Sequence, residues 1–414
     1  MMSILIEQLI NITDAIFLGH VGEIELGASA LAGIWYLAIY MLGFGFSLGL
    51  QVVVARRNGE QRYSETGKTF FQGLFFLSGL AVFLCLFSKL FSPITLSRLI
   101  ASAEVYHAVI DYLDGRIWGL LFSFPFLALR SFLVGITRTK ALNMAALTAV
   151  LVNIPGNWLL IFQWDMGITG AAIASSFAEA CSLAVLAIHI LRKMDKRLYG
   201  LYWSFDKGVL RHVCRVSVWS MFHSFIGVAS WLVFFVAIEH LGEMELAATN
   251  VIRSVSTAFF VIVNSFAATT GSLVSNLLGA GQKAQVIPLC NRIVRLGYAI
   301  GFPLVILALI FYRSIIGIYT ESTFLMQIAH LPFMVMLLNY VFALPGYVYM
   351  NAVTGTGATR MTFIFQLITI VAYQIYLWSI SSFSTSLSVY WTAEYLYVIL
   401  LGLLSVIYLK YKRY

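Results

Sequence analysis

The sequence has little charge, and this shortage excludes most soluble folds. Only 11% of its 414 residues are charged, whereas 60% are hydrophobic and the mean hydropathy is +0.89. Soluble domains are about 25% charged and about 45–50% apolar, so this chain could not cover its surface with polar groups in water. The first residues lack a basic region and a small-residue cleavage site, so no cleavable signal peptide is expected. We therefore expect an all-α polytopic membrane protein.

Metal, disulfide and catalytic motifs are missing as well. The four cysteines form no CxxC pair, and the seven histidines form no HExxH or other ligand spacing. These absences argue against a disulfide framework, a zinc site and a membrane metalloenzyme. Gly45-Phe46-Ser47-Leu48-Gly49 matches the GxSxG pattern of hydrolases, but it lies inside an apolar helix instead of a strand–turn–helix elbow. We expect neither enzyme activity nor a cofactor.

Twelve apolar segments are long enough to cross a bilayer, which takes about 20 residues of helix. The predicted spans are 2–19, 27–55, 69–91, 113–137, 141–163, 168–191, 213–238, 247–277, 291–312, 331–356, 361–381 and 389–410. If the loops are assigned alternately to two sides, 20 of the 26 basic residues fall on one side. Basic loops are cytoplasmic, so both termini of this inner (plasma) membrane protein are predicted to be cytoplasmic. The net charge of +8 therefore reflects topology, and no nucleic-acid partner is expected.

The two halves of the sequence repeat each other at one constant offset. The offset that places His20–Leu26 on His240–Leu246 also places Pro125 on Pro345, without a gap. Both halves begin on the same side, so the repeats are parallel, as in transporters that bind substrate between two bundles. The predicted domains are a six-helix lobe over 1–192, a cytoplasmic linker over 193–210 and a second six-helix lobe over 211–414. Because one chain supplies both repeats, we expect a monomer and not a channel built from a symmetric oligomer.

Asp14 is an ionisable residue within the first predicted span. Charged groups cost about 2.5–3.5 kcal/mol at the centre of a membrane helix, so they are rare and usually functional. Glu7 and Asn11 precede Asp14 on the same helix face. Burial disfavours a charged carboxylate, so Asp14 would bind a proton or hold a cation, which makes it a candidate coupling site. The alternatives are an anchor near the interface and a structural pair.

The fifth predicted span carries two asparagines one turn apart, Asn153 and Asn157, with Pro155 between them. Proline removes a backbone hydrogen bond and kinks the helix, which can free a carbonyl. Two amide oxygens and a free carbonyl can ligate a hard cation. Hydrogen bonding between helices without an ion explains these residues equally well.

Several motifs follow one another in a fixed order along the whole chain. They are Thr13–Gly19 with Asp14, Gly49–Gly59, Gly135–Thr139 with its repeat Gly355–Arg360, Asn153–Asn157 and Gly167–Ala174. In order and spacing these motifs resemble the multidrug and toxic compound extrusion (MATE) family. The resemblance implies a V-shaped pair of six-helix lobes and an efflux antiporter driven by Na⁺ or H⁺.

The resemblance also implies a set of ion ligands. In sodium-binding members, an acid in span one, an Asn and an acid in span five and a Thr in span six surround the ion. The matching positions here hold Asp14, Asn153, Asn157 and Ser175. Asn157 stands where an acid is often found, so weaker Na⁺ binding or a shift toward H⁺ is expected.

The second lobe lacks an acid at the matching positions, since the repeat places Asp14 on Phe234 and Asn153 on Tyr373. We therefore expect the first lobe to carry ion coupling alone. Glu179, one turn after Ser175, is a second-tier candidate together with Glu7 and Asn11. For three further charged residues in predicted spans, pairing or snorkelling toward the interface is expected; these are Arg130, Arg253 and Glu394.

The predicted substrates are small, amphipathic, cationic drug-like compounds. Aromatic residues make up 15% of the chain and can stack on planar cations, although most of them would face lipid. The alternative is a lipid-linked precursor flippase of the same superfamily, which would need several basic residues to bind phosphate. Only Arg130 and Arg253 are placed inside spans, and this argues against the flippase.

Overall fold

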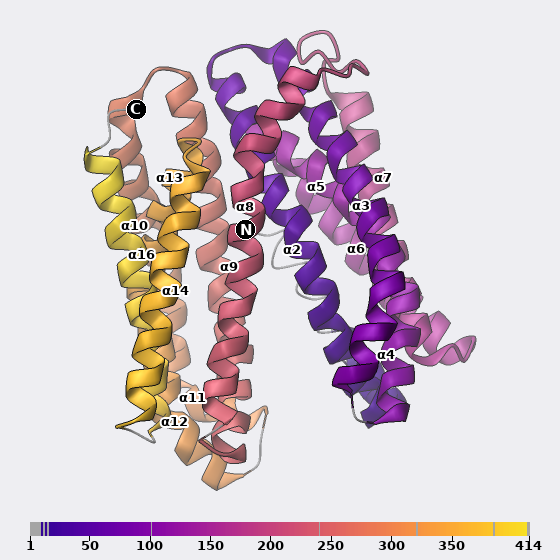
Figure 1. Cartoon of the computed structure of the whole chain (residues 1–414), viewed down its shortest axis with the longest axis vertical. Helices are drawn as coiled ribbons and strands as arrows, with labels where there is room; N and C mark the ends of the chain where they lie inside the picture. The colour runs from indigo at the N-terminus through magenta and orange to yellow at the C-terminus, as the bar shows by residue number, and fades with distance from the viewer. Residues whose placement is uncertain are drawn as a thin grey trace. The chain divides into compact units, whose positions relative to one another are not determined.

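The computed structural model describes residues 10, 13–14, 16–100, 102–239, 241–319, 322–383 and 386–411. Every regular element within these ranges is a helix (Figure 1). In chain order the helices are α2 (Glu23–Gly59), α3 (Tyr63–Leu99), α4 (Ala103–Arg116), η1 (Ile117–Gly119), α5 (Leu120–Gly135), α6 (Lys140–Asn157), η2 (Trp158–Gln163), α7 (Gly167–Lys193), α8 (Lys207–Glu239), α9 (Glu243–Gly279), η3 (Lys283–Gln285), α10 (Val286–Ile310), α11 (Tyr312–Gly317), α12 (Thr323–Leu338), α13 (Tyr340–Gly355), α14 (Thr359–Ser381), α15 (Leu387–Trp391) and α16 (Ala393–Tyr411). The predicted all-α fold is confirmed for the described part of the chain.

Ten helical stretches among the described residues are long and apolar enough to cross a membrane, and each coincides with a predicted span. Of the other two predicted spans, 213–238 lies within the 33-residue helix α8, and 2–19 lies partly outside the described residues. The helices are longer than predicted. α2, for example, has 37 residues, about 55 Å, because it continues beyond the apolar run into Arg56 and Arg57.

The outward face of α3 shows which solvent this fold requires. Phe83, Leu86 and Leu90 recur at helical spacing and are 61%, 59% and 67% exposed. Soluble monomers rarely expose contiguous apolar patches of this kind, whereas lipid tails cover them without cost. The exposed stripe therefore agrees with a helix that faces the bilayer.

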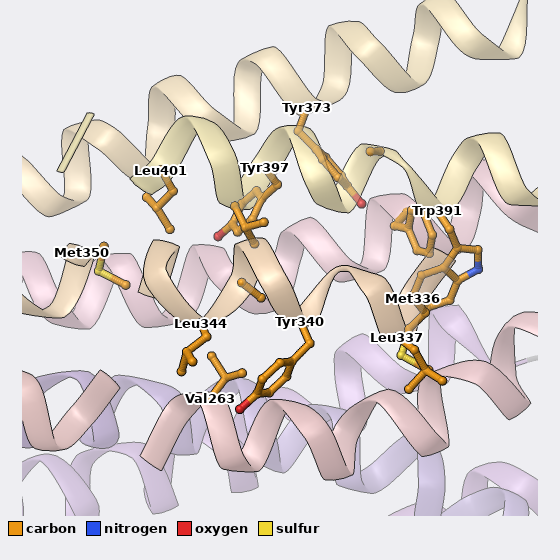
Figure 2. Close-up of a cluster of buried hydrophobic side chains, with 14 of the residues drawn as sticks. Val263, Met336, Leu337, Tyr340, Leu344, Met350, Tyr373, Trp391, Tyr397 and Leu401 are labelled. Atoms are coloured by element: carbon orange, nitrogen blue, oxygen red, sulfur yellow. The ribbon is translucent and has the colours of Figure 1, made fainter. Parts of the chain in front are cut away.

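The chain folds as two compact units, Met2–Ser224 (the first unit) and Phe225–Tyr414 (the second unit). Each unit buries its own hydrophobic clusters, and Figure 2 shows one from the second unit, in which Tyr340, Tyr373 and Trp391 take part. The division falls inside α8.

The polar segment between α7 and α8 is held against α3 within the first unit. The amide of Gly67 donates to the carbonyl of Tyr199 across 2.9 Å, and Nε2 of Gln72 donates to the carbonyl of Ser204 across 2.6 Å. The ring of Trp203 lies 5.1 Å from that of Phe75. The segment predicted as a linker is therefore packed onto this helix.

The helix bounds show the internal repeat directly. α2 begins at Glu23 and ends at Gly59, and the offset of the sequence repeat places these two ends on Glu243 and Gly279, the ends of α9. The same offset relates the end of α5 to that of α13 and the start of α7 to that of α15. Each unit therefore carries the same series of helices in the same register, which allows position-by-position comparison of their interiors.

Candidate ion-binding site

The four predicted ion ligands meet in the first unit, around the carboxylate of Asp14. Nδ2 of Asn153 and Nδ2 of Asn157 donate to Oδ1 of Asp14 across 3.0 and 2.5 Å. Oγ of Ser175 donates to Oδ2 of Asp14 across 2.6 Å. Both asparagines are 0% exposed and Ser175 is 2% exposed, so the donors are withdrawn from solvent. Residues up to 161 positions apart in sequence thus converge on one carboxylate.

The two asparagines are positioned by an irregular stretch of the fifth span. Pro155 lies inside α6 between them, and beyond Asn157 the helix passes into the π-helical segment η2. Proline cannot donate a backbone hydrogen bond. π-helical turns are rare in proteins overall, and those that occur are often found at functional sites. The local sequence therefore departs from a regular α-helix at the point where the side chains face Asp14.

Small residues on α7 let Ser175 reach the carboxylate. Ala171, Ala174 and Ala178 are at most 1% exposed, so this face of α7 is fully covered by its neighbours. Small side chains permit close approach between membrane helices. The hydroxyl of Ser175 consequently lies within hydrogen-bonding distance of both Asp14 and Asn153.

One oxygen of the site has no donor. Oδ1 of Asn157 is buried without a hydrogen-bond partner among the described residues. An unsatisfied buried polar atom costs about 1–3 kcal/mol. Rotation of an asparagine amide exchanges its oxygen and nitrogen, so the pair Asn153 and Asn157 can turn oxygen toward an ion while Asp14 supplies the negative charge. A carboxylate, amide oxygens and a hydroxyl are the ligand types that hard cations prefer, so these residues fit a monovalent cation.

The second-tier candidates do not join this cluster. Glu7 and Asn11 lie outside the described residues. Glu179 lies one turn after Ser175, but its Oε1 accepts from Nη2 of Arg116 across 2.6 Å. The guanidinium of Arg116 lies 4.1 Å from the ring centroid of Tyr36, whose hydroxyl is 3.4 Å from both carboxylate oxygens. Glu179 therefore belongs to an ion pair next to the site.

Sequence reasoning counted Arg116 among the residues of the non-cytoplasmic loops, because it lies only three residues after the predicted start of the fourth span at residue 113. The helix begins earlier, at Ala103, so Arg116 lies well inside the continuous helical stretch Ala103–Gly135. A signal for this start is present in the sequence. Ser102 is a good N-cap residue, and its Oγ accepts from the amide of Val105, while Glu104 occupies the first turn.

The three charged residues for which pairing or snorkelling is predicted each lie beside an aromatic side chain. The guanidinium of Arg130 lies 5.6 Å from the ring centroid of Phe44, and that of Arg253 lies 5.1 Å from that of Phe235. Oε1 of Glu394 accepts from the hydroxyl of Tyr373.

Comparisons with known sequences cover most of the chain. A family model described as MatE matches residues 1–159 and 220–380. Multidrug resistance protein NorM of Vibrio cholerae is 25% identical over 332 residues, which cover 76% of this chain and 70% of that protein. A probable multidrug resistance protein NorM of Synechocystis sp. is 27% identical over 323 residues, which cover 74% of this chain and 68% of that protein.

Solved structures give the same result for the fold. An outward-facing multidrug resistance MATE family transporter of the MOP superfamily superposes with a TM-score of 0.93 at 16% identity, over 100% of this chain and 94% of that chain. The Vibrio cholerae MATE transporter VcmN, determined as a mutant, superposes with a TM-score of 0.90 at 15% identity, over 99% of this chain and 93% of that chain. The fold is therefore shared with these transporters along almost its full length.

Proposed function

Because the chain belongs to the MatE family, we propose that it exports small, amphipathic, cationic compounds in exchange for Na⁺ or H⁺, with Asp14 as the ion-binding residue. The family is one of multi-pass membrane transporters, and relatives named as multidrug resistance proteins support the substrate class. The same relatives support outward transport, because resistance to a drug requires that the drug leaves the cell. In this proposal the protein acts as a monomer in the plasma membrane, with both termini in the cytoplasm.

The observation that carries the proposal is a carboxylate inside a ready-made shell of buried polar groups. Asp14 receives three hydrogen bonds from groups that are themselves buried, and a fourth group, Oδ1 of Asn157, lacks a partner among the described residues. A purely structural network would satisfy its acceptors, since each unsatisfied one is costly. An ion that replaces some of these hydrogen bonds gives the shell two alternative arrangements, which is what a coupling site requires.

The driving force available from one ion depends on the charge of the exported compound. A monovalent cation that crosses the membrane inward releases about 2.3 kcal/mol per 100 mV. At about 1.4 kcal/mol for each factor of ten, this would support about a 40-fold concentration ratio of a neutral compound. One-for-one exchange with a monovalent cationic compound moves no net charge, so the concentration gradient of the ion drives that exchange. Binding of the ion at Asp14 neutralises the carboxylate and releases its donors, so the occupied and empty states of the first unit differ in their internal hydrogen bonds.

The flippase alternative gains no support. The relatives reported above are multidrug resistance proteins by name, and a lipid-linked phosphate would need free basic residues inside the membrane. Arg130 and Arg253 each lie over an aromatic ring, and Arg116 is paired with Glu179.

The proposal is tested with Asp14→Asn in proteoliposomes loaded with a fluorescent cationic dye such as ethidium. An imposed Na⁺ gradient and an imposed H⁺ gradient are applied in separate experiments, and wild-type export should respond to one of them. We expect Asp14→Asn to reduce gradient-driven export to the level of empty liposomes, because the amide has no negative charge to hold a cation and no carboxylate to take up a proton. Asp111→Asn removes an exposed carboxylate from the same unit and should leave export unchanged. Full gradient-driven export in correctly inserted Asp14→Asn protein would remove the site assignment.

A further inference from the structure

Glu394, near the start of α16, occupies in the second unit a position closely related to the Asp14 site of the first. By the repeat, Glu394 corresponds to Ala174, the neighbour of Ser175, and its partner Tyr373 corresponds to Asn153. The correspondence is reliable here because the same offset places Gly167, the start of α7, on Leu387, the start of α15, without a gap. The second unit therefore holds a carboxylate next to the positions that match Ser175 and Asn153. This carboxylate stands on the last helix of its repeat, whereas Asp14 stands in the first span of the other.

The carboxylate is held by a tyrosine within an aromatic cluster. The hydroxyl of Tyr373 donates to Oε1 of Glu394 across 2.9 Å, and the ring of Tyr373 packs edge-on against Tyr397 with centroids 5.8 Å apart. Tyr373 and Trp391 are each 2% exposed, and Figure 2 shows both side chains directed into the same cluster. The surroundings are thus largely apolar, and they are poor solvents for a charged carboxylate.

A small cavity adjoins Glu394. Its volume is about 70 Å³, and its walls come from α9, α12, α13, α15 and α16. Two of the lining residues, Asn339 and Trp391, carry a buried polar atom (Oδ1 and Nε1) that has no hydrogen-bond partner in the described ranges. Polar atoms of this kind are normally satisfied by water, and the volume holds a few water molecules. The cavity therefore leaves room for water beside Glu394.

The ionisable groups around Glu394 are tyrosines. Tyr373 contacts it from α14, Tyr397 lies one turn on along α16, and Tyr347 of α13 lines the same cavity. Within the described part of the chain, no basic side chain forms an ion pair with Glu394.

The basic residues of the neighbouring helices are engaged elsewhere or lie far along the helix. On α9 the one cation, Arg253, stacks on Phe235, and on α12 His330 lies 4.5 Å from the ring of Tyr312. α13 and α15 carry no charged residue. Arg360 on α14 and Lys410 on α16 lie several turns away from Tyr373 and Glu394, about 20 Å or more along the axes.

We propose that Glu394 is a second ion-binding site of this protein and that its ligand is a proton. A sodium ion needs several oxygen ligands, whereas the indole of Trp391 can only donate. Of the lining oxygens, the hydroxyls of Ser256 and Tyr340 are engaged with backbone carbonyls, and Oδ1 of Asn339 is one acceptor without a donor in the described ranges. A proton needs only one carboxylate oxygen and a water path. The site goes beyond the proposed exchange at Asp14 and does not depend on it, because proton binding by Glu394 is measurable without transport.

The test is infrared difference spectroscopy of the purified full-length protein, titrated from mildly acidic to mildly alkaline pH. We expect one titrating carboxylic-acid carbonyl band of the wild type to be missing from Glu394→Gln. The band should persist in Asp14→Asn and in Glu104→Gln, which removes an exposed glutamate. Loss of dye export in Asp14→Asn with retention of the band separates the two sites.

A second variant keeps the proposal testable if Glu394→Gln fails to fold. Tyr373→Phe removes a donor that favours the charged carboxylate, so the midpoint of the band should move to higher pH. The matched control is Tyr376→Phe. Tyr376 lies on the same helix and forms a hydrogen bond with Thr392, so its replacement should leave the midpoint in place. A spectrum of Glu394→Gln that keeps every titrating band of the wild type, or a midpoint unmoved in Tyr373→Phe, overturns the proposal.

Discussion

The two units build the same backbone frame and fill it with opposite chemistry. The repeat pairs Asp14, Asn153, Asn157 and Ser175 of the first unit with Phe234, Tyr373, Leu377 and Tyr395 of the second. Where the first unit places amides on a carboxylate, the second places the rings of Phe234 and Tyr373 6.4 Å apart. The repeat therefore fixes which positions meet, and the residue types decide whether they bind an ion or pack.

The comparison extends to the ion pair of the first unit. Arg116 and Glu179 correspond to Met336 and Ile399 in the second unit, which are both apolar. One copy of the repeat thus places opposite charges at these positions, and the other places two apolar side chains, of which Met336 is buried and Ile399 is 37% exposed. Replacing a whole buried ion pair by apolar residues is often neutral, whereas removing one partner is costly.

The largest loss of stability is therefore expected when only one residue of the ion pair is replaced by its counterpart from the second unit. Arg116→Met leaves Glu179 without its partner and should destabilise the protein by about 3 kcal/mol. The double variant Arg116→Met/Glu179→Ile reproduces the second unit and should recover most of this loss. The thermal unfolding midpoint in detergent measures both. If the double variant is as unstable as the single one, packing in the first unit cannot replace the ion pair, and the equivalence of the two places does not hold.

A smaller effect is expected where the last turn of α5 or α13 crosses a neighbouring helix. A methyl group added at Gly355 would meet the backbone carbonyl of Gly271, whereas one added at the corresponding Gly135 would meet the side chain of Val54. Backbone cannot move aside as a side chain can. Gly355→Ala should cost about 1–3 kcal/mol and Gly135→Ala clearly less, again by thermal unfolding in detergent. Equal losses in the two variants would contradict this difference between the units.

Most of the helical architecture was predictable because lipid imposes a simple rule on sequence. Each span needs about 20 apolar residues, so hydropathy alone located ten helices that the structure describes. The helix ends were less predictable. The start of α4 at Ala103 lies in a polar stretch outside the apolar run, and hydropathy does not register it.

The cluster around Asp14 was predictable because four positions match a family pattern. The contacts of Glu394 were not predictable from the sequence. Comparison of Asp14 and Asn153 with Phe234 and Tyr373 finds no acid, because the carboxylate of the second unit stands on the last helix of its repeat. Only the three-dimensional contact between Tyr373 and Glu394 reveals that a different helix supplies it.

The smallest effect is expected from a change of charge at Asn157 in the first unit. Asn157 is the member of the cluster whose Oδ1 lacks a donor among the described residues, and Asn157→Asp places a second carboxylate there. Added negative charge strengthens cation binding, so we expect the Na⁺ concentration for half-maximal dye export to fall about tenfold, equivalent to about 1.4 kcal/mol.

Asn143→Asp is the matched control for this change, because Asn143 is exposed on the same helix and its replacement should leave the Na⁺ dependence unchanged. Two carboxylates at close range also repel each other, so one of them takes up a proton when no metal ion is bound. If Asn157→Asp makes export more sensitive to pH without lowering the Na⁺ requirement, the cluster binds protons in preference to sodium. Such a result would make the two units alike in their ion and different only in the helix that carries the carboxylate.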